Sequence, residues 1–247
     1  ICATLTPHYC APPNAAEIRK RLGIENAVAF DMNAQCTGFI FSCAVAHSMM
    51  KTLGFKNALV IGSEILSKLT DWTDRTTCIL YGDGAGAAIL SDSEDSSGIK
   101  SVYLEGSNDF DDSLVCLSAL NDSPFAVPQQ ANTKIQMKGG KVFTYAVGAM
   151  KRSVNKVLES SGFSLDDIKW IIPHQANLRI ITSTANRLNV EMDRFFVNID
   201  HTGNTSSATI PIALHELYNT GQLQKGDLII LTGFGAGLAA GALLLEW

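Results

Sequence analysis

The stretch AVAFDMNAQCTGFIFS, residues 27–42, indicates the fold of this chain because it passes from a strand pattern to a helix pattern. Its apolar beginning turns polar, as a buried strand does where it ends, and predicts a strand at Ala27–Phe30. From Thr37 to Leu53 the chain is mostly apolar, free of proline and followed by Gly54, which predicts a buried helix with a glycine stop. Further buried strands alternate with helices, which predicts an α/β protein with a mostly buried sheet.

Cys36 lies where this strand pattern gives way to the helix pattern. Unpaired backbone N–H groups and the positive end of the helix dipole stabilise a thiolate at such a position. Cysteine is also among the most frequently buried residues and often serves only in packing. Cys36 is therefore a candidate nucleophile whose role depends on partners elsewhere in the chain.

The composition favours a compact, heavily buried α/β protein over a nucleic-acid or membrane protein. Of the 247 residues, 46% are hydrophobic and 17% are charged, which is enough apolar material for a large core. The net charge of −5 argues against a globally basic surface for nucleic acid. No apolar run is long enough for a membrane span, so neither nucleic acid nor a membrane is an expected partner.

The cysteines and histidines lack the spacings of a metal site. The six cysteines form no C-x-x-C pair and the five histidines form no H-E-x-x-H motif, so no metal is predicted. Most of the cysteines lie in apolar segments, which favours reduced thiols in a cytoplasmic protein. The chain starts at Ile1 without an initiator Met or a signal-peptide pattern, and is expected to begin inside a domain.

The remaining elements follow from the same patterns. Helices are predicted at Ala15–Leu22, Val142–Ser160, Ala176–Leu188 and Ser206–Leu217, and strands at Asn57–Ser63, after a glycine turn at Gly82–Gly86, from Ile99, and at Lys169–Pro173, Asp227–Thr232 and Gly237–Trp247. Each half of the chain then contains a helix, a buried strand ending in a polar residue, a second helix and closing strands. This parallel predicts two similar units, residues 1–98 and 99–247.

Three further segments carry candidate functional groups. In WIIPHQANLR, residues 170–179, His174 ends a predicted buried strand, although a hydrogen-bonded core histidine is the simpler interpretation. In HTGNTSSA, residues 201–208, Asn204 precedes a helix, where such residues are often ordinary caps. The turn TGFGAGL, residues 232–238, has Leu238 where a dinucleotide-binding loop would have its third glycine.

Taken together, the motifs DMNAQCTGF, YGDGAGA, PHQANLRI and HTGNTSSA resemble those of the β-ketoacyl-acyl carrier protein synthase III family. Their order and spacing match from end to end of the chain. The resemblance implies a thiolase-like fold, in which two related α/β halves form a five-layer α-β-α-β-α stack, with the first half truncated at its N-terminus. It also implies a homodimer.

The family resemblance assigns catalytic roles to four positions. Cys36 would attack an acyl-CoA thioester and become acylated. Backbone N–H groups of Cys36 and Ala236 would stabilise the oxyanion. Neutral His174 and Asn204 would then hold the thioester carbonyl of malonyl-acyl carrier protein during decarboxylation, and the resulting enolate would attack the acyl-cysteine. Acyl-CoA is a substrate in this scheme, and no cofactor is expected.

The resemblance also implies positions that contact coenzyme A. Arg75 matches a residue near the adenine. The positions that match the pantetheine channel are Gly139, Phe143, Ala176 and Asn177.

Other matched positions concern the carrier protein and the acyl chain. Arg179 matches a basic residue that docks the acidic carrier protein, and Arg187, two helical turns later, extends the predicted patch; both are also typical of a solvated helix face. Ala11 lies where a bulkier residue often reaches across the dimer to close the acyl pocket, which suggests a longer or differently shaped pocket.

Two other interpretations remain open on the sequence alone. The same fold and residues serve condensing enzymes of quinolone or polyketide assembly, which use other acceptors. A non-catalytic fragment that only binds acyl carrier protein or dimerises is a third interpretation. The intact set of Cys36, His174 and Asn204 argues against that last one.

Overall fold

A computed structural model describes residues 1–93, 97–117 and 132–247, and its strands form two four-stranded sheets and a small ribbon. The first sheet has the order β2-β1-β3-β4, and the second has the order β5-β10-β9-β8. The strands are β1 (Cys2–Ala3), β2 (Asp31–Met32), β3 (Asn57–Ile65), β4 (Asp83–Ser91), β5 (Gly98–Gly106), β8 (Ile168–Pro173), β9 (Leu228–Gly235) and β10 (Ala239–Glu246), with β6 (Leu114–Val115) paired to β7 (Gln136–Met137) in the ribbon.

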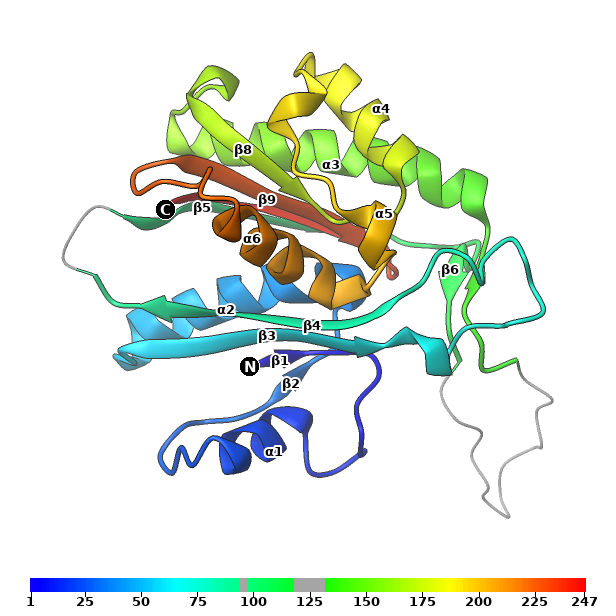
Figure 1. Cartoon of the computed structure of the whole chain (residues 1–247), viewed down its shortest axis with the longest axis horizontal. Helices are drawn as coiled ribbons and strands as arrows, with labels where there is room; N and C mark the ends of the chain where they lie inside the picture. The colour runs from blue at the N-terminus through cyan, green and yellow to red at the C-terminus, as the bar shows by residue number, and fades with distance from the viewer. Residues whose placement is uncertain (94–96, 118–131) are drawn as a thin grey trace.

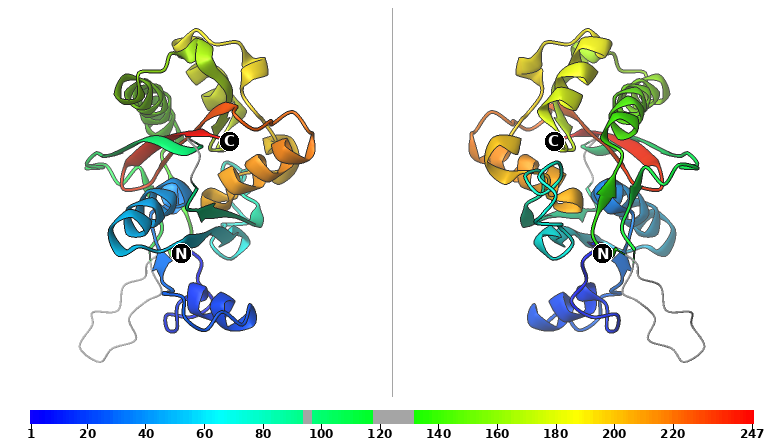
Figure 2. Two further views of the ribbon diagram at one scale, coloured as in Figure 1. Left: turned by 90° about the vertical axis from the view of Figure 1, so that its left-hand side faces the viewer. Right: turned by 90° about the vertical axis from the view of Figure 1, so that its right-hand side faces the viewer.

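The helices alternate with the two sheets to give five layers (Figure 1). Helix α1 covers the outer face of the first sheet, α2 and α6 lie between the sheets, and α3 and α4 cover the outer face of the second sheet, as both side views also show (Figure 2). The α-helices are α1 (Asn14–Arg21), α2 (Gly38–Leu53), α3 (Gly139–Ser161), α4 (Leu178–Leu188), α5 (Ile199–Thr202) and α6 (Thr209–Asn219). Short 3-10 turns are η1 (Gln35–Thr37), η2 (Leu66–Lys68), η3 (Leu165–Asp167), η4 (Met192–Arg194) and η5 (Ser206–Ala208). The predicted five-layer α-β-α-β-α stack is confirmed.

The two halves repeat one pattern of strand pairing. In the first sheet β1 is parallel to β3, and β3 is antiparallel to β4; in the second, β8 is parallel to β9, and β9 is antiparallel to β10. Each central helix, α2 or α6, leads into the middle strand of its own half. The first sheet ends at Ser91 and the second begins at Gly98. The division at residues 98 and 99 stays a prediction, because the central helices pack into one shared core.

That shared core explains why α2 is apolar around most of its circumference. It contacts both sheets and α6, so a polar face would be buried without partners. Phe39 and Ile40 of α2 are almost fully buried against Ile210 of α6 and Leu231 of β9. Full burial of one such side chain contributes about 1.5–3 kcal/mol. The helix ends as predicted at Gly54, whose φ of 73° is the left-handed conformation that glycine adopts easily.

Two local predictions are wrong. The strand expected at Ala27–Phe30 is instead Asp31–Met32, because the neighbouring strand offers only Cys2–Ala3 for pairing. The glycine turn expected at Gly82–Gly86 lies mostly inside β4. There a Cβ on Gly84 would come within 2.8 Å of the Ile212 side chain, so the glycine allows α6 to pack closely on the sheet.

The other boundaries shift by a few residues. The helix expected from Ala176 begins at Leu178, and the one expected from Ser206 starts as η5 before α6. The strand expected from Ile99 is β5, while part of the loop that follows it lies outside the described residues. In the described ranges, no helix combines the length and apolarity needed to cross a membrane.

Candidate active site

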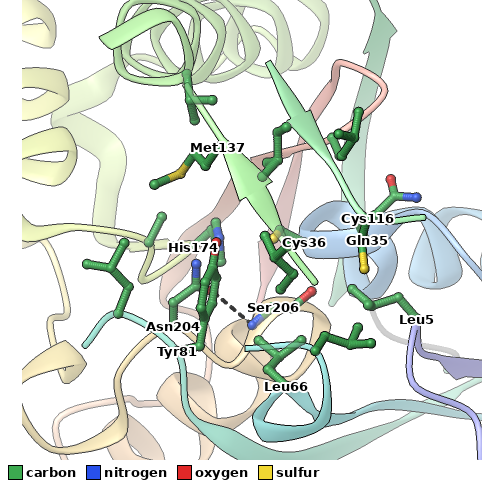
Figure 3. Close-up of a pocket in the computed structure, with 18 of the residues that line it drawn as sticks. Leu5, Gln35, Cys36, Leu66, Tyr81, Cys116, Met137, His174, Asn204 and Ser206 are labelled. Carbon is green, nitrogen blue, oxygen red and sulfur yellow. Dashed lines mark hydrogen bonds between the residues drawn. The ribbon is translucent and has the colours of Figure 1, made fainter. Parts of the chain in front are cut away.

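A cavity of about 1200 Å³ is lined by residues of both halves, including residues at or just past the ends of β8 and β9. Cys36, His174, Asn204 and Ala236 all line it, although they are far apart in the sequence. Figure 3 shows Cys36, His174 and Asn204 converging on one region of the cavity. The structure therefore brings together the four residues that the sequence placed in the catalytic machinery.

Cys36 sits in η1, directly before α2, as the sequence predicts. The turn is held by Thr37, whose hydroxyl donates to the Ala34 carbonyl at 2.7 Å. The end of β9 lies against it: a Cβ built on Gly235 would be only 3.2 Å from the backbone nitrogen of Cys36. The backbone of Ala236 follows directly, so the Cys36 turn and the β9 end border the same side of the cavity.

In the unliganded protein, burial opposes a thiolate at Cys36. Burial raises the pKa of the Cys36 thiol to about 12, and the Ser206 side chain only partly opposes this rise. Burial removes the water that would solvate a thiolate, and here this effect outweighs hydrogen bonding and the start of the helix. Cys36 is therefore a protonated thiol at neutral pH, and its proton must leave when sulfur attacks a thioester.

His174 lies just past the end of β8, and its backbone N–H donates to the Thr232 carbonyl at 2.8 Å. The side chain is 1% exposed and packs edge-on against Phe234, with ring centroids 5.5 Å apart. Burial lowers the pKa of His174 to about 3, so the ring is neutral at pH 7. Neither ring nitrogen has a hydrogen-bond partner among the described residues. The ring can therefore donate one N–H to a substrate oxygen.

Asn204 is fixed by its backbone on both sides. Its N–H donates to the Leu80 carbonyl at 2.8 Å, and its carbonyl accepts from the Gly82 N–H at 3.0 Å. The side-chain Oδ1 accepts from the Ser206 N–H at 2.9 Å. Because the oxygen is used within the loop, the Nδ2 amide group is the donor left for a ligand.

The pantetheine positions predicted from the family resemblance lie along the same cavity. Its lining includes Gly139, Phe143, Ala176 and Asn177, together with the exposed Arg179. Asn177 also caps α4, because its Oδ1 accepts from the Arg179 N–H at 2.9 Å. The lining thus runs from the partly buried Cys36 thiol to a positively charged residue on the surface.

Three predicted positions lie outside this lining. Arg75 is exposed on the loop after η2, and Arg187 is exposed near the end of α4. Ala11 is exposed on the segment before α1. Their proposed contacts with coenzyme A, carrier protein and a dimer partner stay predictions.

Sequence reasoning missed much of the wall of the cavity, which is largely apolar. Figure 3 shows these residues beside the catalytic ones: Leu5, Leu66, Tyr81, Cys116, Met137 and Ser206. Tyr81 begins the motif YGDGAGA, whose glycines predict a turn and do not mark Tyr81 as part of a cavity wall. Burial raises the pKa of Tyr81, so its side chain remains a neutral phenol in the wall. The other wall residues come from separate loops and strands, and no local pattern marks them.

No three potential metal ligands gather in the part of the chain that the structure describes. The cavity instead presents a thiol, a neutral imidazole and an amide, with a largely apolar wall. Such a set can form a covalent thioester and donate hydrogen bonds to a carbonyl oxygen.

Comparison with known proteins agrees with this chemistry. The family 3-oxoacyl-(acyl-carrier-protein) synthase III matches residues 30–107, and the family's C-terminal region matches residues 158–247. The β-ketoacyl-(acyl-carrier-protein) synthases III of Clostridium beijerinckii and Clostridium acetobutylicum are 44% and 45% identical to the chain; each match covers all of this chain and 76% of the relative.

Solved structures show the same fold. The 3-oxoacyl-(acyl-carrier-protein) synthase III of Aquifex aeolicus superposes with a TM-score of 0.92 at 41% identity, over 100% of this chain and 76% of that one. The priming β-ketosynthase of the R1128 polyketide pathway superposes with a TM-score of 0.90 at 32% identity, over 99% and 73%. The chain belongs to the 3-oxoacyl-(acyl-carrier-protein) synthase III family of thiolase-fold condensing enzymes.

Proposed function

We propose that this protein starts fatty-acid chains by condensing a short acyl-CoA with malonyl-acyl carrier protein through an acyl-Cys36 intermediate. The observation that carries the proposal is the convergence of Cys36, neutral His174 and the Asn204 amide in one cavity. A thiol beside two neutral hydrogen-bond donors suits a decarboxylative Claisen condensation, which needs a covalent acyl carrier and a stabilised enolate.

In the first step, the Cys36 sulfur attacks the acyl-CoA carbonyl. The carbon–sulfur bond to coenzyme A breaks, and the proton that Cys36 loses ends on the departing thiol. The N–H groups of Cys36 and Ala236 border the same part of the cavity and serve as oxyanion donors. Removing one donor of this kind typically costs about 2.7–4 kcal/mol of transition-state stabilisation.

In the second step, malonyl-acyl carrier protein occupies the cavity. An N–H of His174 and the Nδ2 group of Asn204 donate to its thioester oxygen while carbon dioxide leaves, so the enolate charge develops against two fixed donors. The enolate carbon attacks the acyl-Cys36 carbonyl, a carbon–carbon bond forms, and the carbon–sulfur bond to Cys36 breaks. The thiolate released from Cys36 takes up one proton from solvent, and its high pKa favours this return to the thiol.

The two substrates enter along the lined channel. Phe143, Ala176 and Asn177 contact the pantetheine arm, while Gly139 leaves room for it, and Arg75 lies near the coenzyme A nucleotide. Arg179 and Arg187 receive the acidic carrier protein. The scheme needs no cofactor beyond the substrates, and we propose that the enzyme works in the cytoplasm.

We also propose that the active form is a homodimer. β2 is the edge strand of the first sheet, and the preceding Val28 is 61% exposed, which is unusual for an apolar side chain beside a sheet edge. A second copy of the chain would cover this edge and bring Ala11 toward the partner's acyl pocket. Light scattering of the protein in solution tests the dimer.

A polyketide-type priming synthase is the second candidate, because a protein with that name shares the fold at 32% identity. The two candidates differ in acceptor and primer.

Purified protein is supplied with a panel of acyl-CoA primers and with malonyl-acyl carrier protein. Formation of β-ketoacyl-acyl carrier protein from acetyl-CoA or another short primer supports the proposal, and a requirement for a different acceptor favours the alternative. Carrier-protein binding without any product indicates a non-catalytic protein.

A further inference from the structure

Glu64, near the end of β3, is a buried carboxyl group that the mechanism above does not use. It is 2% exposed, and hydrogen-bond donors surround it. Oε2 accepts from the Thr6 hydroxyl at 2.8 Å and from the Leu5 N–H at 3.1 Å, with the Thr4 hydroxyl at 3.3 Å. Oε1 lies 2.8 Å from the hydroxyl of Ser207. One side chain thus links the strand end at residues 4–6 to the loop that carries Asn204.

The contacts of Ser207 show where the hydrogens lie. Its Oγ is 2.8 Å from the Ala3 carbonyl oxygen and 2.8 Å from Oε1 of Glu64. A serine hydroxyl has one hydrogen, so it can donate fully to only one of these oxygens. If Glu64 were ionised, one of the two contacts would join oxygens with no hydrogen between them. A proton on Oε1, donated to Ser207 while Ser207 donates to Ala3, satisfies both contacts.

The loop of residues 203–207, which Glu64 contacts through Ser207, contains two residues with positive φ. Gly203 has a φ of 65° and Ser206 a φ of 49°, and a serine in this left-handed region is strained. The loop also lies directly on β3, since a Cβ on Gly62 would be 2.2 Å from the Ser207 carbonyl oxygen. Gly62 and Glu64 are two residues apart and therefore share one face of the strand. Gly62 allows the contact, and Glu64 fixes it with a hydrogen bond.

The surrounding electrostatics agree with a neutral side chain. Burial raises the pKa of Glu64 against the lowering effect of its four hydrogen bonds. Glu64 influences the thiols of Cys2 on β1 and Cys36 on η1 electrostatically, and an ionised Glu64 would raise the pKa of both. A neutral Glu64 would not raise the pKa of Cys36 in this way, so Cys36 would lose its proton more easily.

We propose that Glu64 is a positioning residue that acts as a protonated carboxylic acid and holds the Asn204–Ser207 loop at the correct distance from Cys36. The inference rests on the proposed role of Asn204 in decarboxylation. Glu64 touches no substrate and acts through Ser207 and the strained loop.

The test compares Glu64→Gln with Glu64→Ala. Glutamine reproduces the protonated acid, because its oxygen accepts from residues 4–6 while its amide nitrogen donates to Ser207. We expect Glu64→Gln to keep kcat for malonyl-acyl carrier protein decarboxylation within about twofold, and Glu64→Ala to lower it at least tenfold with KM changed less than twofold. Ser207→Ala should lower kcat similarly, and adding it to Glu64→Ala should cause little further loss. The exposed Glu25→Gln is the control for a glutamate-to-glutamine change away from the loop.

A second measurement does not depend on activity. The rate of Cys36 alkylation by iodoacetamide is followed by peptide mapping between pH 6 and pH 10 in the wild type and in Glu64→Gln. We expect the same pH profile. Faster alkylation of Glu64→Gln at lower pH would show an ionised Glu64, and an unchanged kcat in both Glu64→Ala and Ser207→Ala would remove the positioning role. A wild type that alkylates normally but makes no condensation product would count against the proposed function and leave the protonation of Glu64 standing.

Discussion

The side-chain oxygen of Asn204 accepts a hydrogen bond from the backbone N–H of Ser206 at 2.9 Å, and this contact orients the amide. With the oxygen engaged inside the loop, the Nδ2 group is the end available to the cavity. The orientation therefore follows from the backbone of residues 204–206 and does not require a bound substrate.

Asn204→Asp tests this orientation. One carboxylate oxygen still accepts from Ser206, but the other replaces a donor with an acceptor that repels a thioester oxygen. The rate of malonyl-acyl carrier protein decarboxylation should fall about 10²–10³-fold, the typical cost of one oxyanion donor. Carbon dioxide release measures this rate, with the exposed Asn26→Asp as the control for an added charge. Wild-type decarboxylation in Asn204→Asp would mean that the amide does not contact the carbonyl.

His174→Ala should separate the two halves of the reaction. The N–H donors assigned to acylation are on Cys36 and Ala236, so loss of the imidazole should abolish decarboxylation and leave acyl-Cys36 detectable by intact mass after acyl-CoA treatment. Circular dichroism establishes that the variant is folded. Loss of acylation as complete as the loss of decarboxylation, in a folded variant, would contradict this division of roles.

The buried neutral His174 predicts an acid-dependent loss of stability. Its pKa falls from about 6.5 in the unfolded chain to about 3 in the fold, so the unfolded state binds the proton more readily. The contribution of His174 to the free energy of unfolding is therefore complete above pH 6.5 and is lost as the pH falls toward 3. His174→Gln lacks this proton, so the free energy of unfolding of the wild type should drop relative to His174→Gln between pH 7 and pH 4.5, by urea unfolding. A constant difference over that range would exclude this effect of His174.

Arg179 should matter for the carrier protein and little for coenzyme A. The chain has a net charge of −5 and acyl carrier proteins are acidic, so docking needs a local positive surface. Arg179→Glu should raise KM for malonyl-acyl carrier protein several-fold at low salt, with acylation by acyl-CoA nearly unchanged. The effect should shrink above 0.1 M salt, where exposed charges are screened over about 10 Å.

Arg187→Glu is the matched comparison on the same helix. An unaltered KM in Arg179→Glu together with a raised KM in Arg187→Glu would move the docking site toward the end of α4. If neither changes KM at low salt, α4 is not the docking surface, and Lys151 and Arg152 of α3 are the next residues to replace.

The sequence predicts the parts of this protein that depend on local patterns. The helix after Cys36 has an unbroken apolar run and a terminal glycine, and β8 and β9 are apolar runs of strand length, so each was recognised within a few residues. The family motifs then placed Cys36, His174 and Asn204, and the structure brings their side chains into one cavity.

The remainder depends on tertiary packing. The glycines around Gly84 predict a turn, whereas the structure uses Gly84 to let α6 pack on β4, a contact with a residue 128 positions away in the chain. The helix start at Cys36 predicts stabilisation of a thiolate, whereas the burial that raises its pKa depends on the whole fold. Glu64 shows no motif, since its partners at residues 4–6 and 207 come together only when β1, β3 and η5 pack.

The most direct test of the account is the site of acylation. The protein is incubated with acetyl-CoA, and peptide mass mapping then locates the acetyl group among the six cysteines. We expect a single thioester on Cys36, absent in Cys36→Ser, which is discharged when malonyl-acyl carrier protein is added. Acetylation of Cys43 or Cys78 with Cys36 unmodified would contradict the central claim that Cys36 carries the acyl group.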